Sequence, residues 1–219
     1  MIAGRDGIRA ALWWSAALGT LAATSAWLRA DETGRLFFDR EGLILANAWR
    51  SPWLDWVLLS LTWLGSLLIL LPLALVAATL LWRQGHRDDG RFVVVALAGA
   101  SLLAQLVKHL MLRPRPDLFA ALTPVGSPLS FPSAHAVQAT AVAAALWLVA
   151  VRLRPDCRQW LLPVLLAIVV LVDCSRIYLQ VHYPSDVLAG TLAAACWVFG
   201  LRALMLPKDI ASDRRAKQP

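Results

Sequence analysis

The chain has 219 residues, of which 59% are hydrophobic and only 16% are charged, which is typical of an integral membrane protein. The formal net charge of +7 would suit nucleic acid. However, the arginines cluster at the edges of apolar segments, where they act as topology signals and contact anionic lipid headgroups, so we expect no nucleic-acid partner. At this length a single domain over residues 1–219 is expected.

Six segments are long and apolar enough to cross a bilayer, which takes about 20 helical residues. They cover residues 10–28, 56–82, 92–112, 133–151, 160–181 and 184–206. The first lacks the short apolar core and small-residue cleavage site of a signal peptide, so we expect it to be retained as a span. The sequence therefore predicts an all-α fold, an integral membrane bundle of six transmembrane helices.

The region between the first two spans mixes charges with glycine and tryptophan over residues 29–55. Ser51 and Pro52 are suited to restarting a helix there. We expect a short interfacial helical segment, with Trp49, Trp53 and Trp56 at headgroup depth. The apolar run 56–82 is too long for one perpendicular span. It either tilts or begins as a surface helix, with a break at Gly65.

The distribution of basic residues predicts the orientation in the membrane. With six spans, both termini lie on one side, and the loops of that side hold 13 of the 21 lysines and arginines. By the positive-inside rule we expect cytoplasmic termini. The polar tail, about residues 207–219, is expected to be disordered.

Alternation of the spans brings four helix ends to the non-cytoplasmic side. The polar side chains at these ends are Lys108, Arg115, Ser133, His135, Arg176, His182 and Asp186. Three cations around two imidazoles indicate an anionic ligand. Phosphate fits best, because arginine offers paired donors to phosphate oxygens and lysine adds a point charge.

Two of the helix starts have specific signals. Ser133 is a natural N-cap, so the N–H groups of Ala134 and His135 would form a cradle for an anion at the positive helix end. A proline begins the sixth span, which places Asp186 in its first turn, able to reach back towards His182. A carboxylate that holds one imidazole nitrogen leaves the other free to act as a nucleophile or base.

Each of these residues can be assigned a role in phosphoryl transfer. His182, oriented by Asp186, would attack phosphorus in line and form a phosphohistidine, while protonated His135 donates to the leaving oxygen and later activates water. The phosphoryl oxygens would be held by Lys108, Arg115, Arg176, Ser133 and the N–H group of Ala134. We expect no metal and no other cofactor, because three cations neutralise the phosphate and the sequence lacks a carboxylate cluster for magnesium.

In these motifs the sequence resembles the type 2 phosphatidic acid phosphatase (PAP2) superfamily. The three matching motifs are Lys108, six residues and Arg115-Pro116; Pro132-Ser133-Ala134-His135; and Ser175-Arg176, five residues, His182, three residues and Asp186. The resemblance implies a helical bundle and metal-independent hydrolysis of a phosphate ester or diphosphate. Ala134 stands where the family more often has glycine. It still offers its N–H, so we expect a slightly tighter cradle that keeps its activity.

The candidate substrates are undecaprenyl diphosphate, phosphatidylglycerol phosphate, phosphatidate and lipid A phosphates. Family analogy indicates a bacterial inner membrane, with the site facing the periplasm. Two other functions stay open. A lipid phosphotransferase would use the same site but pass the phosphate to an added acceptor. A non-enzymatic lipid headgroup binder or transporter would keep its function in a His135→Ala variant.

Two further charges lie close to the motifs. Asp173 is three residues before Arg176 on the same helix face, so that it either pairs with this arginine or faces a polar cavity. Arg113 lies outside the motif spacing, and we expect it to contact the loop or lipid headgroups.

Overall fold

The computed structural model describes residues 2–30 and 37–205, and within these ranges the protein contains helices and no strand. The helices are α1 (Ile2–Ala30), α2 (Phe37–Ala48), α3 (Pro52–Leu61), η1 (Thr62–Gly65), α4 (Leu67–Arg83), α5 (Arg87–Met111), α6 (Ala134–Leu153), η2 (Pro155–Cys157), α7 (Arg158–Tyr178) and α8 (Pro184–Met205). The all-α prediction is confirmed. The tail predicted to be disordered, residues 207–219, lies outside the described residues.

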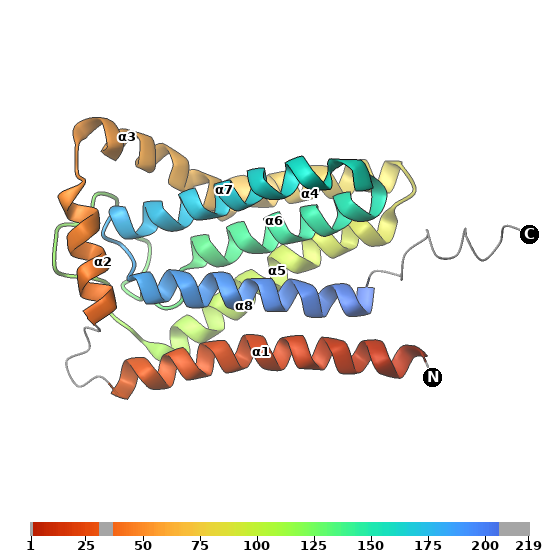
Figure 1. Ribbon diagram of the computed structural model, residues 1–219, viewed down its shortest axis with the longest axis horizontal. Coiled ribbons are helices and arrows are strands. Elements are labelled where there is room, and N and C mark those ends of the chain that lie inside the picture. Colours follow the sequence, from red (N-terminus) through yellow and green to blue (C-terminus); the bar gives the residue numbers. More distant parts are fainter. Residues whose placement is uncertain (1, 31–36, 206–219) are drawn as a thin grey trace, which may run out of the picture.

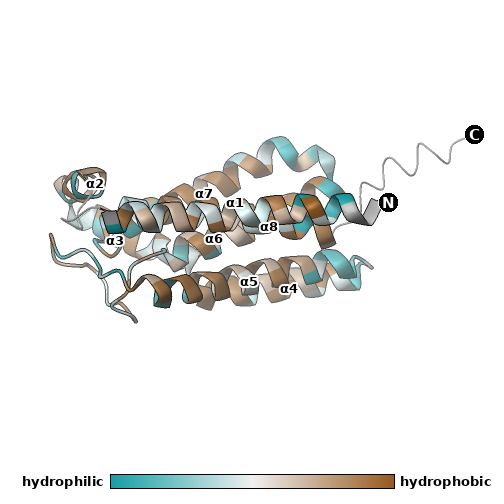
Figure 2. Ribbon diagram, turned by 90° about the horizontal axis from the view of Figure 1, so that it is seen from below, coloured by the Kyte–Doolittle hydropathy of each residue, from teal (hydrophilic) through white to brown (hydrophobic). Residues whose placement is uncertain are grey.

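The long helices run side by side, and α2 lies across one end of the bundle (Figure 1). Apolar residues predominate along the helices, while polar residues gather towards their ends (Figure 2). Four described helical segments are long and apolar enough to cross a membrane, namely α5, α6, α7 together with η2, and α8. A fifth results if the bent pair of α3–η1 and α4 forms one span. The remaining predicted span, α1, is 29 residues long but is not among these apolar helices.

The second predicted span is broken at the position that its sequence indicates. The α3–η1 segment ends at Gly65, and α4 begins after Ser66 at an angle of 46°. Ser66 caps α4, because its Oγ accepts a hydrogen bond from the Leu68 N–H at 3.3 Å. A Cβ at Gly65 would lie 2.6 Å from Cγ1 of Val172 in α7. The break therefore occurs where the chain approaches α7 too closely for a side chain.

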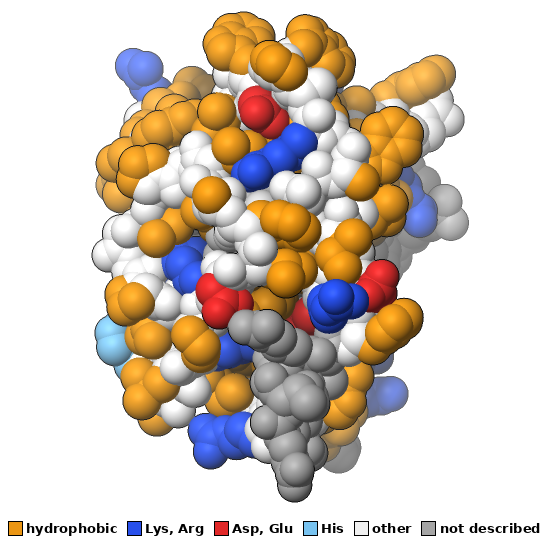
Figure 3. All heavy atoms as spheres, turned by 90° about the vertical axis from the view of Figure 1, so that its left-hand side faces the viewer, with side chains coloured by type: hydrophobic (Ala, Val, Ile, Leu, Met, Phe, Trp, Pro, Cys, Tyr) orange, Lys and Arg blue, Asp and Glu red, His pale blue; other side chains and the backbone are white. Residues whose placement is uncertain are grey.

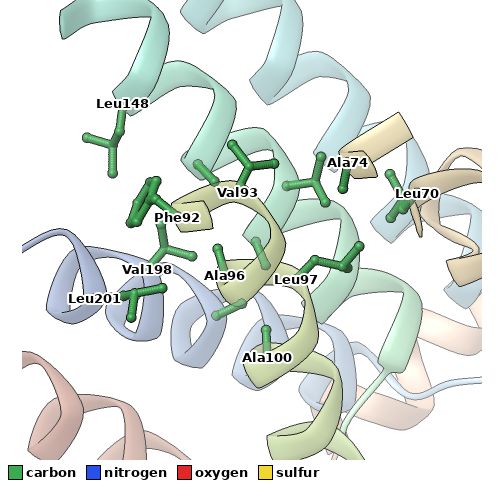
Figure 4. Close-up of a cluster of buried hydrophobic side chains, with 14 of the residues drawn as sticks. Leu70, Ala74, Phe92, Val93, Ala96, Leu97, Ala100, Leu148, Val198 and Leu201 are labelled. Atoms are coloured by element: carbon green, nitrogen blue, oxygen red, sulfur yellow. The ribbon is translucent and has the colours of Figure 1, made fainter. Parts of the chain in front are cut away.

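Helix α6 occupies the centre of the bundle, between α5, α7 and α8. Its residues Ala136, Ala141 and Ala145 are completely buried. Small residues let neighbouring backbones approach closely, which is how membrane helices gain van der Waals contact. Figure 4 shows the main cluster of buried hydrophobic side chains, most of which come from α5 and α6, with smaller contributions from α4 and α8.

Helix α1 packs along α8 through aromatic side chains. Trp14 stacks on Trp197 with ring centroids 5.6 Å apart, and Trp13 stacks on Phe199 at 5.1 Å. A Cβ at Gly200 would lie only 2.4 Å from Nε1 of Trp14. The glycine therefore makes room for the indole and brings the two helices together.

Candidate active site

The predicted site residues lie at one end of the bundle, where α5 and α7 end, α6 and α8 begin, and α2 crosses (Figure 1). Figure 3 views this end face-on and shows basic and acidic side chains at several separate places among hydrophobic ones. The structure thus brings Lys108, Arg115, Ser133, His135, Arg176, His182 and Asp186 to the same end, as the alternation of the spans predicts.

His182 and Asp186 are both buried, with 2% and 0% of their surfaces exposed. Nδ1 of His182 lies 3.5 Å from Oδ2 of Asp186, which is close but does not form a hydrogen bond. Oδ2 instead accepts the backbone N–H of Tyr183 at 3.0 Å. Asp186 therefore reaches back across the first turn of α8, as in a capping box, and its carboxylate lies beside the imidazole.

Arg115 faces the opposite edge of the His182 ring. Its Nη1 lies 3.2 Å from Nε2 of His182 and donates to the carbonyl of Val181 at 2.6 Å. Its Nε donates to the carbonyl of Ser127 at 2.7 Å. A guanidinium can only donate, so Nε2 must act as the acceptor and the ring proton belongs on Nδ1, facing Asp186. This assignment leaves the lone pair of Nε2 on the side of the cations.

Lys108 and Arg176 are also buried, each held by a short contact. Nζ of Lys108 donates to the carbonyls of Leu129 and Ser130 at 2.9 and 3.3 Å. Nη1 of Arg176 donates to Oγ1 of Thr62, in η1, at 2.7 Å. These bonds hold Lys108 on the loop that precedes α6 and Arg176 on η1.

The cations have a direct effect on the imidazole. Burial, followed by the charges of Arg176, Arg115 and Lys108, lowers the pKa of His182 well below its ordinary value of 6.5. Burial also lowers the pKa of Arg115. His182 is therefore neutral in the absence of an anion, which is the state in which an imidazole nitrogen can attack phosphorus.

At the start of α6, Ser133 takes the N-cap position, but its hydroxyl makes no capping hydrogen bond. The residue is completely buried, and its N–H donates to the carbonyl of Asp186 at 3.2 Å. His135, in the first turn, packs against Gly65 and lies within electrostatic reach of Arg176 and His182. Ser133 is thus at the N-cap, as predicted, but its hydroxyl does not cap the helix and stays available for another partner.

The buried polar atoms without a hydrogen-bond partner among the described residues include three that belong to predicted site residues: Oγ of Ser133, Nε of Arg176 and Nδ1 of His182. Buried polar groups without a partner are rare, and each requires an explanation. Phosphoryl oxygens would accept from the hydroxyl and the guanidinium. Within residues 2–30 and 37–205, no group of three or more His, Cys, Asp or Glu side chains could hold a metal ion.

For two nearby charges, one of the two predicted alternatives is wrong. Asp173 does not pair with Arg176; its Oδ2 accepts a hydrogen bond from Oγ1 of Thr191 in α8 at 2.8 Å. Arg113 is not a headgroup contact, because its side chain is buried and binds Asp39 and Asp186 at 2.7 and 2.5 Å. In both cases the partners lie in helices far along the sequence, so the residues next to Asp173 and Arg113 do not identify them.

Asp39 and Thr62 were not recognised from the sequence at all. Asp39 lies in the first turn of α2 and is completely buried, and Thr62 is the partner of Arg176. A signal for Asp39 did exist, because helical spacing places it on the same face as Leu43, and an unpaired carboxylate on an apolar face would be costly.

Comparison with known proteins supports a common origin with lipid phosphatases. Residues 89–209 match the family model of the PAP2 superfamily. The chain is 34% identical over 144 residues to phosphatidylglycerophosphatase B of Bacillus subtilis (strain 168), a match that covers 64% of this chain and 70% of the relative. It is 41% identical over 107 residues to decaprenylphosphoryl-5-phosphoribose phosphatase of Mycobacterium tuberculosis (strain CDC 1551 / Oshkosh), covering 47% of this chain and 55% of that relative.

The fold is similar to that of a solved structure. The crystal structure of the first transmembrane PAP2 type phosphatidylglycerolphosphate phosphatase from Bacillus subtilis superposes with a TM-score of 0.77 at 26% identity. The superposition covers 93% of this chain and 98% of the other.

Proposed function

Because this chain belongs to the PAP2 superfamily of phosphatases, we propose that it hydrolyses a lipid phosphate or diphosphate through a phosphohistidine at His182. Phosphatidylglycerol phosphate is the first candidate, since the similar Bacillus subtilis relative and the similar solved structure, also from Bacillus subtilis, are both named for that substrate. The observation that carries the mechanism is the contact of 3.2 Å between Arg115 and Nε2 of His182, with the Asp186 carboxylate on the other edge of the ring.

The reaction proceeds in two steps. The lone pair of Nε2 attacks phosphorus, the N–P bond forms, and the P–O bond to the lipid breaks as His135 gives a proton to the leaving oxygen. Water then loses a proton to His135 and attacks phosphorus. The N–P bond breaks, inorganic phosphate leaves, and the electron pair returns to Nε2.

The phosphoryl charge is neutralised by the protein itself. Lys108, Arg115 and Arg176 stabilise the equatorial oxygens together with the Ser133 hydroxyl and the Ala134 N–H, so the reaction needs no metal ion. The lipid chain stays in the bilayer, alongside the apolar outer faces of the helices, while its headgroup enters at the end of the bundle.

We propose that α1 is the sixth span, because it packs along α8 through Trp14 and Trp197. The helix ends opposite the site carry Arg83, Arg87, Arg91, Arg152, Arg154, Arg158 and Arg202. The positive-inside rule then places that end, with both termini, in the cytoplasm of a bacterial inner membrane, and the site at the periplasmic face.

The decisive test replaces His182 by alanine in purified protein and measures phosphate release from phosphatidylglycerol phosphate with EDTA present. Loss of the nucleophile should lower the rate by at least about 10⁴-fold. The control is His109→Ala, an exposed histidine of α5 whose Nδ1 contacts the Gln105 carbonyl of the same helix, and this variant should keep full activity. Substantial turnover by the His182 variant would refute the mechanism.

A labelling experiment tests the intermediate. Protein quenched with ³²P-labelled substrate should carry an acid-labile, base-stable label that the His182→Ala variant lacks. If an added alcohol or lipid acceptor captures the label in preference to water, the protein is a phosphotransferase that uses the same site.

A further inference from the structure

Arg113, in the loop after α5, has a buried side chain that connects two helices from distant parts of the sequence. Its Nη1 donates to Oδ1 of Asp186 at 2.5 Å, and its Nη2 donates to Oδ2 of Asp39 at 2.7 Å. The guanidinium lies 3.9 Å from the centroid of the Tyr183 ring. Both carboxylates are completely buried. A buried carboxylate is very costly unless a cation and hydrogen bonds compensate it, so the three charges depend on one another.

Asp39 also holds the first turn of α8. Its Oδ1 accepts the N–H of Ser185 at 2.8 Å, and its Oδ2 accepts the Ser185 hydroxyl at 2.6 Å. The first N–H groups of a helix have no partner within the helix, and a side-chain oxygen at the N-cap usually satisfies one of them. Here the oxygen comes from α2 instead. A Cβ at Gly42 of the same helix would lie 2.5 Å from Cγ of Pro184, so α2 is in close contact with this turn.

The turn held in this way is the one that carries Asp186. Arg113 fixes Oδ1 of that carboxylate and the Tyr183 N–H fixes Oδ2, which sets the plane of the carboxylate facing Nδ1 of His182. Without Arg113 the carboxylate would lose its charged partner and the constraint on its orientation.

We propose that Arg113 and Asp39 are positioning residues of the reaction. Asp39, on α2, holds Arg113 and the start of α8, and Arg113 holds Asp186 where it orients the imidazole of His182. The proposal rests on the proposed role of His182 as the nucleophile. Neither residue needs to contact the phosphoryl group, so their effect is on the rate of the chemical step rather than on substrate binding.

The test compares Asp39→Asn, Arg113→Gln and Arg113→Lys with the unaltered protein in kcat, KM and thermal stability in detergent. Asp39→Asn and Arg113→Gln should each lower kcat by about tenfold or more, as is typical for residues that orient a reacting group, and change KM less than about twofold. Arg113→Lys keeps the positive charge but cannot bind both carboxylates with two nitrogens, so its kcat should lie between those of Arg113→Gln and the unaltered protein.

The protein contains a matched control at the other end of the bundle. Arg152 of α6 binds Asp89 of α5 with both Nε, at 3.0 Å, and Nη2, and Asp89 is completely buried. Arg152→Gln should lower the stability of the fold and leave kcat unchanged. If the Arg113 network only stabilised the fold, both pairs would behave alike, and an equal loss of kcat in Arg152→Gln would overturn the proposal.

A double-mutant cycle isolates the connection between the two residues. If Asp39 acts through Arg113, adding Asp39→Asn to Arg113→Gln should lower kcat by less than about twofold more, because contacting residues are not additive. Should Arg113→Gln fail to fold, the isosteric Asp39→Asn decides the matter alone. Full kcat in Asp39→Asn, with His182→Ala inactive, would refute the positioning role and leave the proposed function intact.

Discussion

At the scale of the residue, burial and neighbouring charges decide what His182 can do. Its ring is almost completely enclosed, and Arg176, Arg115 and Lys108 further disfavour a second proton on it. Three fixed cations would repel one another without an anion between them. The arrangement therefore favours a neutral imidazole and an anionic ligand, which are the two reactants of a nucleophilic attack on phosphate.

The lowered pKa of His182 predicts a loss of stability in acid. Below pH 6.5 a histidine in the unfolded chain takes up a proton that the folded protein excludes, so falling pH favours unfolding. This residue should lower the free energy of unfolding by up to about 1.4 kcal/mol per pH unit below that value, until the pH reaches its pKa in the folded protein.

Thermal unfolding in detergent between pH 7 and 5 measures this dependence. His182→Asn should flatten the slope, whereas His109→Asn, at an exposed position, should leave it as it is. Identical slopes in all three proteins would show that the proton is not excluded by His182.

At the scale of the element, α2 has two different faces. Asp39 and Leu43 are buried against the bundle, while the large apolar side chains that point outward are Phe37, Phe38 and Leu45, joined by Trp49 just after the helix. A helix that exposes such a face beside a membrane protein lies in the interface with its apolar side in lipid. The interfacial segment expected between the first two spans stays a prediction, which this exposed face favours, and residues 31–36 of that segment lie outside the described residues.

The exposed face of α2 predicts a defect that depends on the form of the substrate. Phe37→Ser combined with Leu45→Ser should lower activity on a lipid phosphate in liposomes by about fivefold or more, because each side chain loses apolar contact with lipid. Hydrolysis of a water-soluble aryl phosphate in detergent should not change. Trp160→Ser, an exposed aromatic of α7 at the opposite end, serves as the control. A loss of equal size with both substrates would indicate damage to the site instead of weaker contact with the membrane.

At the scale of the whole molecule, charge is distributed unevenly between the two ends. The end opposite the site carries arginines at the tips of α4 to α8, and most of these face solvent. At the site, Lys108 and Arg176 are buried, Arg115 is half-buried, and all three are held by hydrogen bonds. Only the first group can act as a topology signal. The exposed arginines at one end therefore predict the orientation of the molecule in the membrane.

Labelling with a membrane-impermeant maleimide can measure this orientation. Cys157 lies in η2, at the end opposite the site, and Gly126 lies in the loop at the site end with open space around it. In variants that lack Cys174 and Cys196, Cys157 should react only after the cells are permeabilised. With Cys157→Ser and Gly126→Cys, labelling should occur in intact spheroplasts. The reverse pattern would invert the proposed topology.

The features that depend on local pattern could be predicted from the order of the amino acids alone. Apolar runs located α5 to α8 within a few residues, Ser51 and Pro52 marked the start of α3, and Gly65 marked the break. Motif spacing selected the residues that the structure then brings to one end of the bundle. Such features can be predicted because a bilayer requires apolar helices of nearly fixed length, and strict alternation then assigns each helix end to a side.

The pairing of the charges, in contrast, became clear only from the way the helices pack. Arg113 binds Asp39, 74 positions away; Arg176 binds Thr62; and Asp173 binds Thr191. Helical periodicity predicts on which face of its helix a residue lies, but it does not predict which other helix packs against that face. That choice depends on how the helices pack, and packing requires every buried charge to find its partner among residues far apart in the chain.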